Sequence, residues 1–206
     1  MTSPLVTKPI LRGSKVELRP LDDRAIDAMI GILQEPDVLI KTGTAHSRIT
    51  ETHPFDEART REWYGRRNEK QNRLDLAIYI PELDQYVGEV VFNEYDPNNL
   101  SVNYRIAIGK AGQNKGYGTE ATKLMVDYGF EHLGLNRIEL EVYDFNARAR
   151  HVYTSCGFVP EGRRREALCI DGTFHDALLK AVIRKDWEAA RSVNGYLQLS
   201  ETHVAI

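Results

Sequence analysis

Three alternating segments follow one another in the middle of the chain, separated only by short turns. Residues 74–80 place Leu or Ile at every second position, and residues 86–95 and 100–108 continue as two further strand-like segments. Residues 81–85 and the Asp-Pro-Asn-Asn run at 96–99 are rich in residues that favour turns. Because connections this short join antiparallel neighbours, the sequence predicts an antiparallel meander.

A helix and a further strand follow the meander. Residues 119–133 carry apolar side chains at helical spacing, and Gly134 is a typical helix stop. Residues 137–143 alternate Ile, Leu and Val with Glu, which is typical of a strand. A strand, a helix and a strand in this order predict one parallel crossover.

The segment before the meander adds a strand and two helices. Residues 15–19 alternate like a half-buried strand, and Asp22 and Asp23 open a helix with apolar residues at helical spacing. Residues 39–54 show little periodicity and indicate a loop. Residues 56–67 begin with two acidic residues, which are favourable at a helix N-terminus, and indicate a second helix. The order expected before the meander is therefore strand, helix, loop and helix.

The segment after the crossover closes the fold. Asn146 is a suitable cap for a short helix at 147–156, and residues 162–170 and 173–183 flank a two-residue Asp-Gly hairpin turn. We expect an α/β fold, in the sense of a mixed α+β sheet, within a single domain. The expected boundaries are residues 1–206 for the domain, about 12–187 for its core and 188–206 for a polar tail.

Composition and charge argue against several classes of function. The 206 residues are 42% hydrophobic, and 27 Lys and Arg stand against 30 Asp and Glu, so no overall positive charge favours nucleic acid or an anionic membrane. No run approaches the ~20 apolar residues of a membrane span, and residues 1–8 lack the apolar run of a signal peptide, so we expect a cytoplasmic protein. Cys156 and Cys169 do not suit a disulfide framework or a closed zinc site, and the histidines lack metal-ligand spacing, so no metal is expected.

The candidate binding segment is Gln-Asn-Lys-Gly-Tyr-Gly-Thr at residues 113–119, between a predicted strand and a predicted helix. Glycines at such a junction let the backbone approach a ligand, and the unpaired amides at a helix start carry partial positive charge, which together favour a pyrophosphate. The alternative is an ordinary glycine-rich turn. The letters match neither a P-loop nor a dinucleotide-binding fingerprint.

Here the sequence resembles the GNAT superfamily of N-acetyltransferases, whose acetyl-CoA motif reads Gln/Arg-x-x-Gly-x-Gly/Ala. Gln113, Gly116 and Gly118 match that motif in register. The likeness extends over nearly the whole chain, at residues 16–21, at 88–92 and at Asn146, Tyr153, Gly157 and Phe158. Residues 127–130 and 170–173 are similar to the branch that contains the ribosomal-protein N-terminal acetyltransferases and the spermidine acetyltransferases.

The resemblance implies a GNAT-like acyl-CoA N-acyltransferase fold with a splayed central strand pair, and acetyl-CoA as the acyl donor. Backbone groups at 106–108 would receive the pantetheine arm, residues 113–119 the pyrophosphate, and backbone near Ile108 the developing oxyanion. The residues implied in binding acetyl-CoA are Ile106, Ala107, Ile108, Gln113, Asn114, Lys115, Gly116, Tyr117, Gly118, Thr119, Asn146 and Arg150. Lys115, Arg148 and Arg150 are placed to meet the adenosine phosphates, with plain surface solvation as the alternative.

Acetyl transfer to an amine requires a base and benefits from an acid. A lysine-like amine has a pKa near ~10.4 and is mostly charged at neutral pH, so its proton must be removed before it attacks. Glu94 is the first candidate base and Glu89 the second, although each could instead only decorate an exposed strand face. Tyr153 is the candidate acid that protonates the leaving thiolate, with a packed core aromatic as the alternative. Candidates for the acceptor side are His46, Trp63 and Tyr64.

We therefore expect an N-acetyltransferase that moves an acetyl group from acetyl-CoA to a primary amine. The acceptor is expected to be a protein N-terminal amine or a small polyamine, and the sequence leaves that choice open. The alternative is a non-catalytic acyl-CoA-binding sensor or subunit, against which the presence of Tyr153 and a nearby glutamate argues. Residues 192–206 are a candidate contact for a homodimer.

Overall fold

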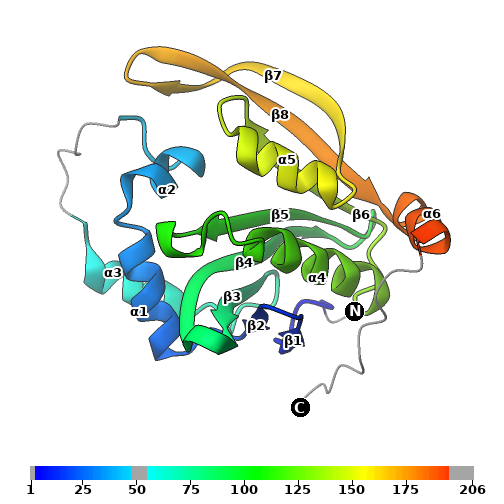
Figure 1. Ribbon diagram of the computed structural model, residues 1–206, viewed down its shortest axis with the longest axis horizontal. Coiled ribbons are helices and arrows are strands. Elements are labelled where there is room, and N and C mark those ends of the chain that lie inside the picture. Colours follow the sequence, from blue (N-terminus) through cyan, green and yellow to red (C-terminus); the bar gives the residue numbers. More distant parts are fainter. Residues whose placement is uncertain (1–2, 48–54, 195–206) are drawn as a thin grey trace.

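The computed structural model describes residues 3–47 and 55–194 of the chain. Within these residues the strands form one eight-stranded sheet in the order β1-β2-β3-β4-β5-β6-β8-β7. β5 and β6 pair in parallel, whereas the other neighbouring strands are antiparallel. The mixed α/β fold expected from the sequence is confirmed (Figure 1).

The strands and helices have the following bounds. The strands are β1 (Leu11–Arg12), β2 (Glu17–Arg19), β3 (Leu74–Ile80), β4 (Gln85–Asp96), β5 (Ser101–Ile108), β6 (Arg137–Tyr143), β7 (Val159–Ile170) and β8 (Thr173–Ile183). The helices are α1 (Asp23–Ile32), α2 (Pro36–Lys41), α3 (Glu57–Gly65), α4 (Tyr117–Glu131), α5 (Ala147–Ser155) and α6 (Arg184–Asn194), with short 3₁₀ turns η1 (Pro81–Leu83) and η2 (Lys110–Gly112). Within residues 3–47 and 55–194, each helix is too short or too polar to cross a membrane.

Helices cover both faces of the central meander (Figure 1). α4 and α5 contribute Met125 and Tyr153 to the main core, which also contains Leu76 of β3. α1 and α3 form a second core around Met29 and Tyr64, which contains Ala77 of the same strand. Since neighbouring residues of a strand point to opposite faces, the two cores lie on opposite sides of the sheet. β3 is consequently buried along its whole length.

The central parallel pair is splayed, as expected. β5 and β6 pair only over Ser101↔Arg137, Val102↔Ile138 and Asn103↔Glu139, although β5 continues to Ile108 and β6 to Tyr143. The two strands therefore diverge after the first few residues and leave a gap between their carboxyl ends. α4 connects them, and it begins at Tyr117 because Gly116 takes a left-handed conformation with φ of 81° at its N-cap.

Several short elements near the N-terminus differ from the expectation. β1 has two residues, and α2 occupies residues that were expected to begin a loop. Leu5 is fully buried in the main core, so the core starts before the expected residue 12. β1 and the six-residue α2 are too short to display a hydrophobic period, which is why the pattern of the sequence does not reveal them.

α6 crosses the expected boundary between core and tail at residue 187. Its Trp187 packs on Phe130 of α4 with ring centroids 5.3 Å apart, and the indole nitrogen donates to Asp127 Oδ1 over 2.6 Å. The Arg184 guanidinium also donates to the carbonyls of Phe130 and Leu135. One large aromatic side chain thus docks a helix whose composition is otherwise polar, so residues 188–194 of the expected polar tail belong to α6. Residues 195–206 lie outside the described part of the chain.

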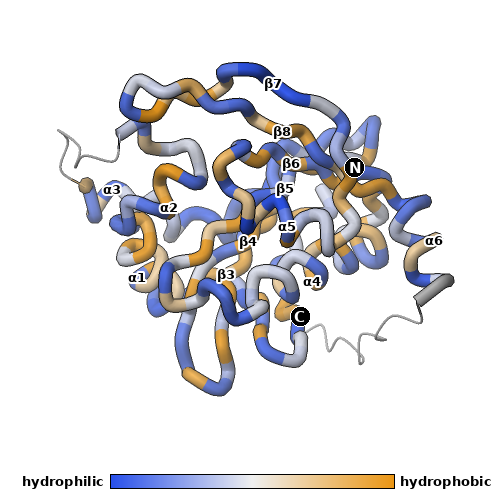
Figure 2. Tube along the Cα trace, turned by 45° about the horizontal axis from the view of Figure 1, so that its top comes forward, coloured by the Kyte–Doolittle hydropathy of each residue, from blue (hydrophilic) through white to orange (hydrophobic). Residues whose placement is uncertain are grey.

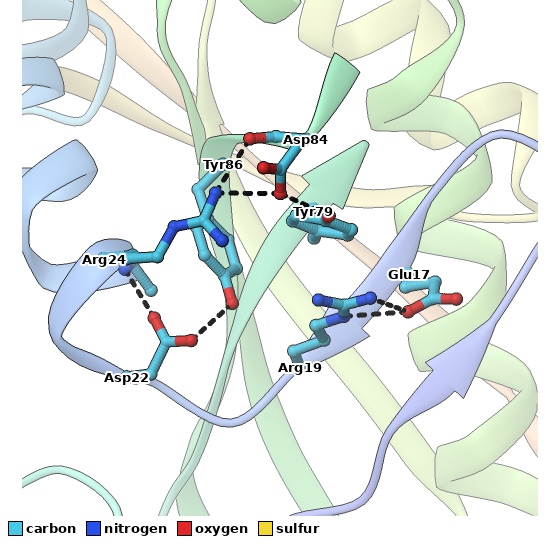
Figure 3. A network of polar contacts seen from close by, with 8 residues as sticks. Glu17, Arg19, Asp22, Arg24, Tyr79, Asp84 and Tyr86 are labelled. Carbon is cyan, nitrogen blue, oxygen red and sulfur yellow. Dashed lines mark hydrogen bonds and ion pairs between the residues drawn. The ribbon is translucent and has the colours of Figure 1, made fainter. Parts of the chain in front are cut away.

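A polar network ties the start of α1 to the β3–β4 hairpin (Figure 3). Asp22 caps α1 by accepting from Ala25 N over 2.7 Å, and its other oxygen accepts from the Tyr86 hydroxyl over 2.8 Å. Asp84 in the hairpin turn accepts from Arg24 over 2.8 Å and from the Tyr79 hydroxyl over 2.6 Å. The network is partly exposed, and it links the N-terminus of α1 to the hairpin.

The β7–β8 hairpin extends beyond the rest of the sheet (Figure 1) and is hydrophilic along much of β7 (Figure 2). Its far end returns to the body of the protein through a third apolar cluster that joins Ile40 of α2 with Leu168 and Ile170. His46 adds a hydrogen bond of 3.1 Å from Nδ1 to the Cys169 carbonyl, and its own carbonyl accepts from Asp171 N over 3.0 Å. The hairpin and the α2 segment together close one end of the gap between β5 and β6.

Candidate active site

A cavity of about 690 Å³ occupies the gap left by the splayed strands. Its walls come from β5, the end of β6, the segment leading into α4, one side of α5, the end of α2 and part of β7. This volume falls in the range of small-molecule sites, and such sites commonly lie where neighbouring strands of an open sheet part. The cavity is therefore the candidate active site.

The backbone of β5 offers free hydrogen-bonding groups to the cavity. Gly109 N donates to Val87 O, and β4 and β5 are in antiparallel register from there onward. Because backbone groups alternate in direction along a strand, the N–H and C=O of Ala107 point to β4, whereas those of Ile106 and Ile108 point into the gap. The prediction that Ala107 offers its backbone groups to the ligand, as Ile106 and Ile108 do, is wrong. The N–H and C=O of Ala107 bond to β4 within the sheet.

The glycine segment brings the start of α4 to the cavity. Gly116 is the N-cap of α4 and makes no side-chain capping bond, so the first amides of this helix keep their unpaired donors. Gly118 packs closely on the end of β5, because a Cβ added there would lie 2.9 Å from Ile108 Cδ1. A helix start with free amides attracts anions, which fits the predicted pyrophosphate-binding role.

Gln113 links this segment to both walls of the cavity. Its Nε2 donates to the Ile108 carbonyl over 3.0 Å, and its Oε1 accepts from Arg148 of α5 over 2.7 Å. Arg148 is thereby held at the cavity wall, where its charge favours a phosphate group.

Most residues predicted to bind the donor line the cavity, and three do not. The lining contains Ile106, Ala107, Ile108, Gln113, Asn114, Gly116, Gly118, Thr119 and Asn146. Lys115, Tyr117 and Arg150 lie outside the lining. Arg150 turns away because its guanidinium donates to the Asp144 carbonyl over 3.1 Å. Asn146 combines two roles, since its Oδ1 accepts from Ala149 N over 3.2 Å to cap α5 while the residue faces the cavity.

Tyr153 lies on α5 at the floor of the cavity and is 6% exposed. Its ring packs edge-on against Tyr104 at 6.3 Å and tilts against Phe158 at 5.8 Å. Burial raises the pKa of the Tyr153 hydroxyl well above its usual value, and the nearby Arg105 guanidinium opposes part of that rise. The phenol therefore holds its proton at neutral pH, as a general acid must. Its ring is also packed in the core, so both roles considered for Tyr153 are compatible with its position.

The two candidate glutamates of β4 differ in position. Glu94 lies in a β-bulge between the pairs Asn93↔Asn103 and Asp96↔Ser101, with a positive φ of 54°. A bulge redirects a side chain, and Glu94 is exposed and lines the cavity. Of the two glutamates, Glu94 is the one that faces the site.

Glu89 instead lies under α3, outside the cavity lining. Its Oε1 accepts from the Tyr64 hydroxyl over 2.9 Å, and its buried Oε2 has no hydrogen-bond partner among the described residues. Burial, followed by the charge of Asp75, raises the pKa of Glu89 to about 7, while Tyr64, Arg67 and Arg73 act in the opposite direction.

The aromatic and histidine residues expected on the acceptor side lie elsewhere. Tyr64 is buried in the second core, and Trp63 stacks under the Arg67 guanidinium at 3.0 Å. His46 holds the hairpin rather than lining the cavity. Both cysteines are free and half-buried, and burial raises the pKa of Cys156 to about 11.

Sequence reasoning misses several polar residues of the cavity. Arg105 and Asn103 belong to β5, and their place in its alternation is the one signal that could have identified them. Arg164 of β7 also lines the cavity, and it donates to Glu141 over 2.5 Å. Arg164 lies on β7 and Glu141 on β6. The two strands are distant in the sequence, so no local sequence pattern shows that these side chains meet.

Comparison with known proteins identifies the family. The model of the "Acetyltransferase (GNAT) domain" matches residues 15–159. The probable N-acetyltransferase YjcK of Bacillus subtilis is 28% identical over 181 residues, which cover 87% of this chain and 99% of that protein. Spermidine N(1)-acetyltransferase of Escherichia coli is 30% identical over 125 residues, covering 60% of this chain and 67% of that protein.

The fold is similar to that of solved acetyltransferases. The structure of spermidine N-acetyltransferase from Vibrio cholerae in complex with CoA and spermine superposes with a TM-score of 0.74 at 22% identity, covering 85% of this chain and 99% of that one. An acetyltransferase of the GNAT family from Bacillus anthracis gives a TM-score of 0.72 at 18% identity over 85% of this chain and 99% of that one. Family model, relatives and fold agree, and the chain belongs to the GNAT acetyltransferase family as an N-acetyltransferase that transfers an acetyl group to an amine.

Proposed function

We propose that this protein binds acetyl-CoA in the cavity between β5 and β6 and transfers its acetyl group to a primary amine that enters beside α2. The observation that carries the proposal is the splayed strand pair, which leaves the backbone groups of Ile106 and the N–H of Ile108 without a strand partner, next to the uncapped start of α4. The strand edge suits the amides of a pantetheine arm, and the helix start suits a pyrophosphate.

The proposed reaction uses three parts of the cavity. The neutral amine attacks the thioester carbonyl, and a backbone N–H near Ile108 stabilises the negative oxygen that forms. The C–S bond then breaks, and the leaving thiolate takes its proton from the Tyr153 hydroxyl. Glu94 accepts the proton that the amine releases, directly or through a water molecule. This assignment is supported by the position of Glu94 in the lining and by the absence of Glu89 from it.

The amine acceptor belongs to one of two classes suggested by relatives. Spermidine N(1)-acetyltransferase of Escherichia coli suggests a polyamine. The putative ribosomal N-acetyltransferase YdaF of Bacillus subtilis, 29% identical over 104 residues that cover 50% of this chain and 57% of that protein, suggests a protein N-terminal amine. Homodimer formation, cytoplasmic location and a reaction without metal, nucleic acid or membrane stay predictions.

The test measures CoA-thiol release from acetyl-CoA with spermidine and with short peptides that have free N-termini. We expect release with at least one acceptor, a large drop in kcat for Tyr153→Phe, and a drop for Glu94→Gln that becomes smaller as the pH rises. Tyr128→Phe is the matched control, because Tyr128 is a buried tyrosine of α4 outside the cavity lining.

Each variant is also titrated with acetyl-CoA by calorimetry. Binding without release in the wild-type protein would favour the non-catalytic binder. Equal loss of activity in Glu89→Gln and Glu94→Gln would contradict the assignment of the base.

A further inference from the structure

The charged residues on the acceptor side of the cavity are the starting point of this inference, which rests on the proposed function. The acceptor wall is defined here as Lys41 of α2, Glu94 of β4, Arg105 of β5, Glu141 of β6 and Arg164 of β7, all of which line the cavity. Three of these side chains are cations and two are anions, so the wall is not acidic. A binding site for a polycation is expected to be acidic.

Most of these charges are already paired. Arg164 donates to Glu141 over 2.5 Å, and Lys41 bonds Asp37 one helical turn away over 2.9 Å. An ion pair inside the wall offers little net charge to a ligand. The recognition of a charged acceptor therefore depends on Arg105 and Glu94.

Arg105 is an exposed guanidinium that makes no hydrogen bond or ion pair with any residue in 3–47 or 55–194. It lies on β5 beyond Asn103, where the pairing with β6 has ended. Like Tyr153 it lines the cavity, and its charge opposes part of the rise in pKa that burial causes at the hydroxyls of Tyr143 and Tyr153. An arginine presents five donors in a planar fork that matches a carboxylate.

Glu94 is the complementary free charge. The described residues provide it with no ion-pair partner, and the register places it and Arg105 on either side of the Asn93↔Asn103 pair. The two side chains form no salt bridge with each other within the described structure. Among the described residues, the wall thus presents one unpaired anion on β4 and one unpaired cation on the neighbouring strand β5.

We infer that the acceptor carries a carboxylate in the same molecule as its reacting amine, as an amino acid or a short acidic peptide does, and that Arg105 binds this carboxylate while Glu94 receives the amine. Arg105 is then a specificity-determining residue. A linear polyamine would place its second positive charge against the Arg105 guanidinium, which disfavours it because like charges repel in a partly enclosed site.

The test compares ω-amino acids, from glycine to 6-aminohexanoate, with their carboxamides at saturating acetyl-CoA. We expect wild-type kcat/KM to favour the carboxylates, with an optimum at the chain length that spans Glu94 and Arg105. Arg105→Gln should lower kcat/KM for the carboxylates by about tenfold to a hundredfold, the effect of losing a charge-assisted hydrogen-bonded pair, and leave the carboxamides nearly unchanged. The ratio of wild type to variant for each acceptor cancels differences in amine pKa between acids and amides.

Two further variants sharpen the comparison. Arg165→Gln makes the same change of charge at the neighbouring position on β7, outside the lining, and should leave the preference intact. Arg105→Glu should reverse the preference, so that spermidine becomes a better acceptor than any ω-amino acid.

Several results would overturn the inference. One is a loss of kcat/KM in Arg105→Gln that is equal for the ω-amino acids and their carboxamides. Another is a wild-type enzyme whose kcat/KM is higher for spermidine than for every ω-amino acid. If the protein acetylates no amine of either kind, the proposed function fails. A calorimetric titration of 6-aminohexanoate and glycine onto the protein–CoA complex still decides the role of Arg105, because carboxylate binding that is unaltered in Arg105→Gln refutes it.

Discussion

Two glutamates five residues apart on β4 have opposite environments. Glu94 reaches solvent at a bulge, whereas Glu89 is enclosed by Tyr64, Asp75, Arg67 and Arg73. A buried carboxylate with one unpaired oxygen is costly when it is ionised, because desolvation disfavours the charged form. Glu89 therefore links the stability of the protein to pH, while Glu94 is free to take part in chemistry.

The consequence for stability has a defined sign. Burial raises the pKa of Glu89 from its usual 4.5 to about 7, so the folded state keeps a proton that the unfolded chain has released across that interval. The contribution of this group is fully present below about pH 4.5 and is lost as the pH rises through 7. We expect Glu89→Gln to match the wild type near pH 4 and to exceed its unfolding free energy by on the order of 3 kcal/mol at pH 8.

Urea unfolding of both proteins from pH 4 to pH 8 checks this expectation. Glu82→Gln is the control, since Glu82 is exposed in the turn after β3. A difference between Glu89→Gln and the wild type that does not change with pH would contradict it.

At the scale of elements, helix ends and short connections decide where α1 and α2 lie relative to the sheet. The Asp22 carboxylate serves α1 twice, because it caps the helix and receives the Tyr86 hydroxyl of β4 (Figure 3). α2 is held through Ile40 and the hairpin end, which shape the acceptor end of the cavity. Loss of these contacts would move the walls of the cavity without changing any residue that is proposed to take part in the reaction.

Asp22→Ala tests the first of these links. We expect a loss of about 1–2 kcal/mol in unfolding free energy, the usual cost of removing an N-cap together with one further hydrogen bond. Asp23→Ala, which changes the next residue in the first turn of the same helix, should cost less than half as much. Chemical denaturation of the two variants compares them, and equal losses would mean that the cap and the Tyr86 bond contribute nothing specific.

The elements also show what the sequence can and cannot predict. The bounds of β6 follow from its strict alternation of Ile138, Leu140 and Val142 with glutamates, and α1 follows from its cap and period. The glycine segment could be placed at a strand-to-helix junction by pattern, whereas the splay of β5 from β6 was implied only by family resemblance. Arg105 and Arg164 could not be predicted as neighbours of one site, because sequence periodicity says nothing about where a long hairpin returns.

At the scale of the whole molecule, the proposed donor site joins parts of the chain that are distant in sequence. Its walls combine β5, the start of α4 and α5, so a bound ligand contacts the meander, the crossover and the closing segment at once. A ligand that binds only the folded state stabilises the whole domain by mass action. Donor binding is therefore expected to appear as a global change in thermal stability.

Acetyl-CoA should raise the midpoint of thermal unfolding, with a stabilisation of roughly 2.7 kcal/mol when its concentration is a hundred times Kd. Gly118→Val should lose most of this rise, because Gly118 lines the cavity at the start of α4 and a valine side chain there would crowd Ile108 and occupy space needed by the ligand. Gly31→Ala is the control, since a Cβ there meets open space. Differential scanning calorimetry measures all three proteins, and a full ligand response in Gly118→Val would contradict the predicted donor site.

The most direct test of acetyl transfer is mass spectrometry of the acceptor after incubation with acetyl-CoA that carries a deuterated acetyl group. We expect the label to appear on the amine nitrogen of the acceptor, one molecule of CoA to be released for each labelled amine, and Tyr153→Phe to slow both equally. Release of CoA with the label recovered only as free acetate would mean hydrolysis rather than transfer, and acetyl transfer to an amine would be refuted.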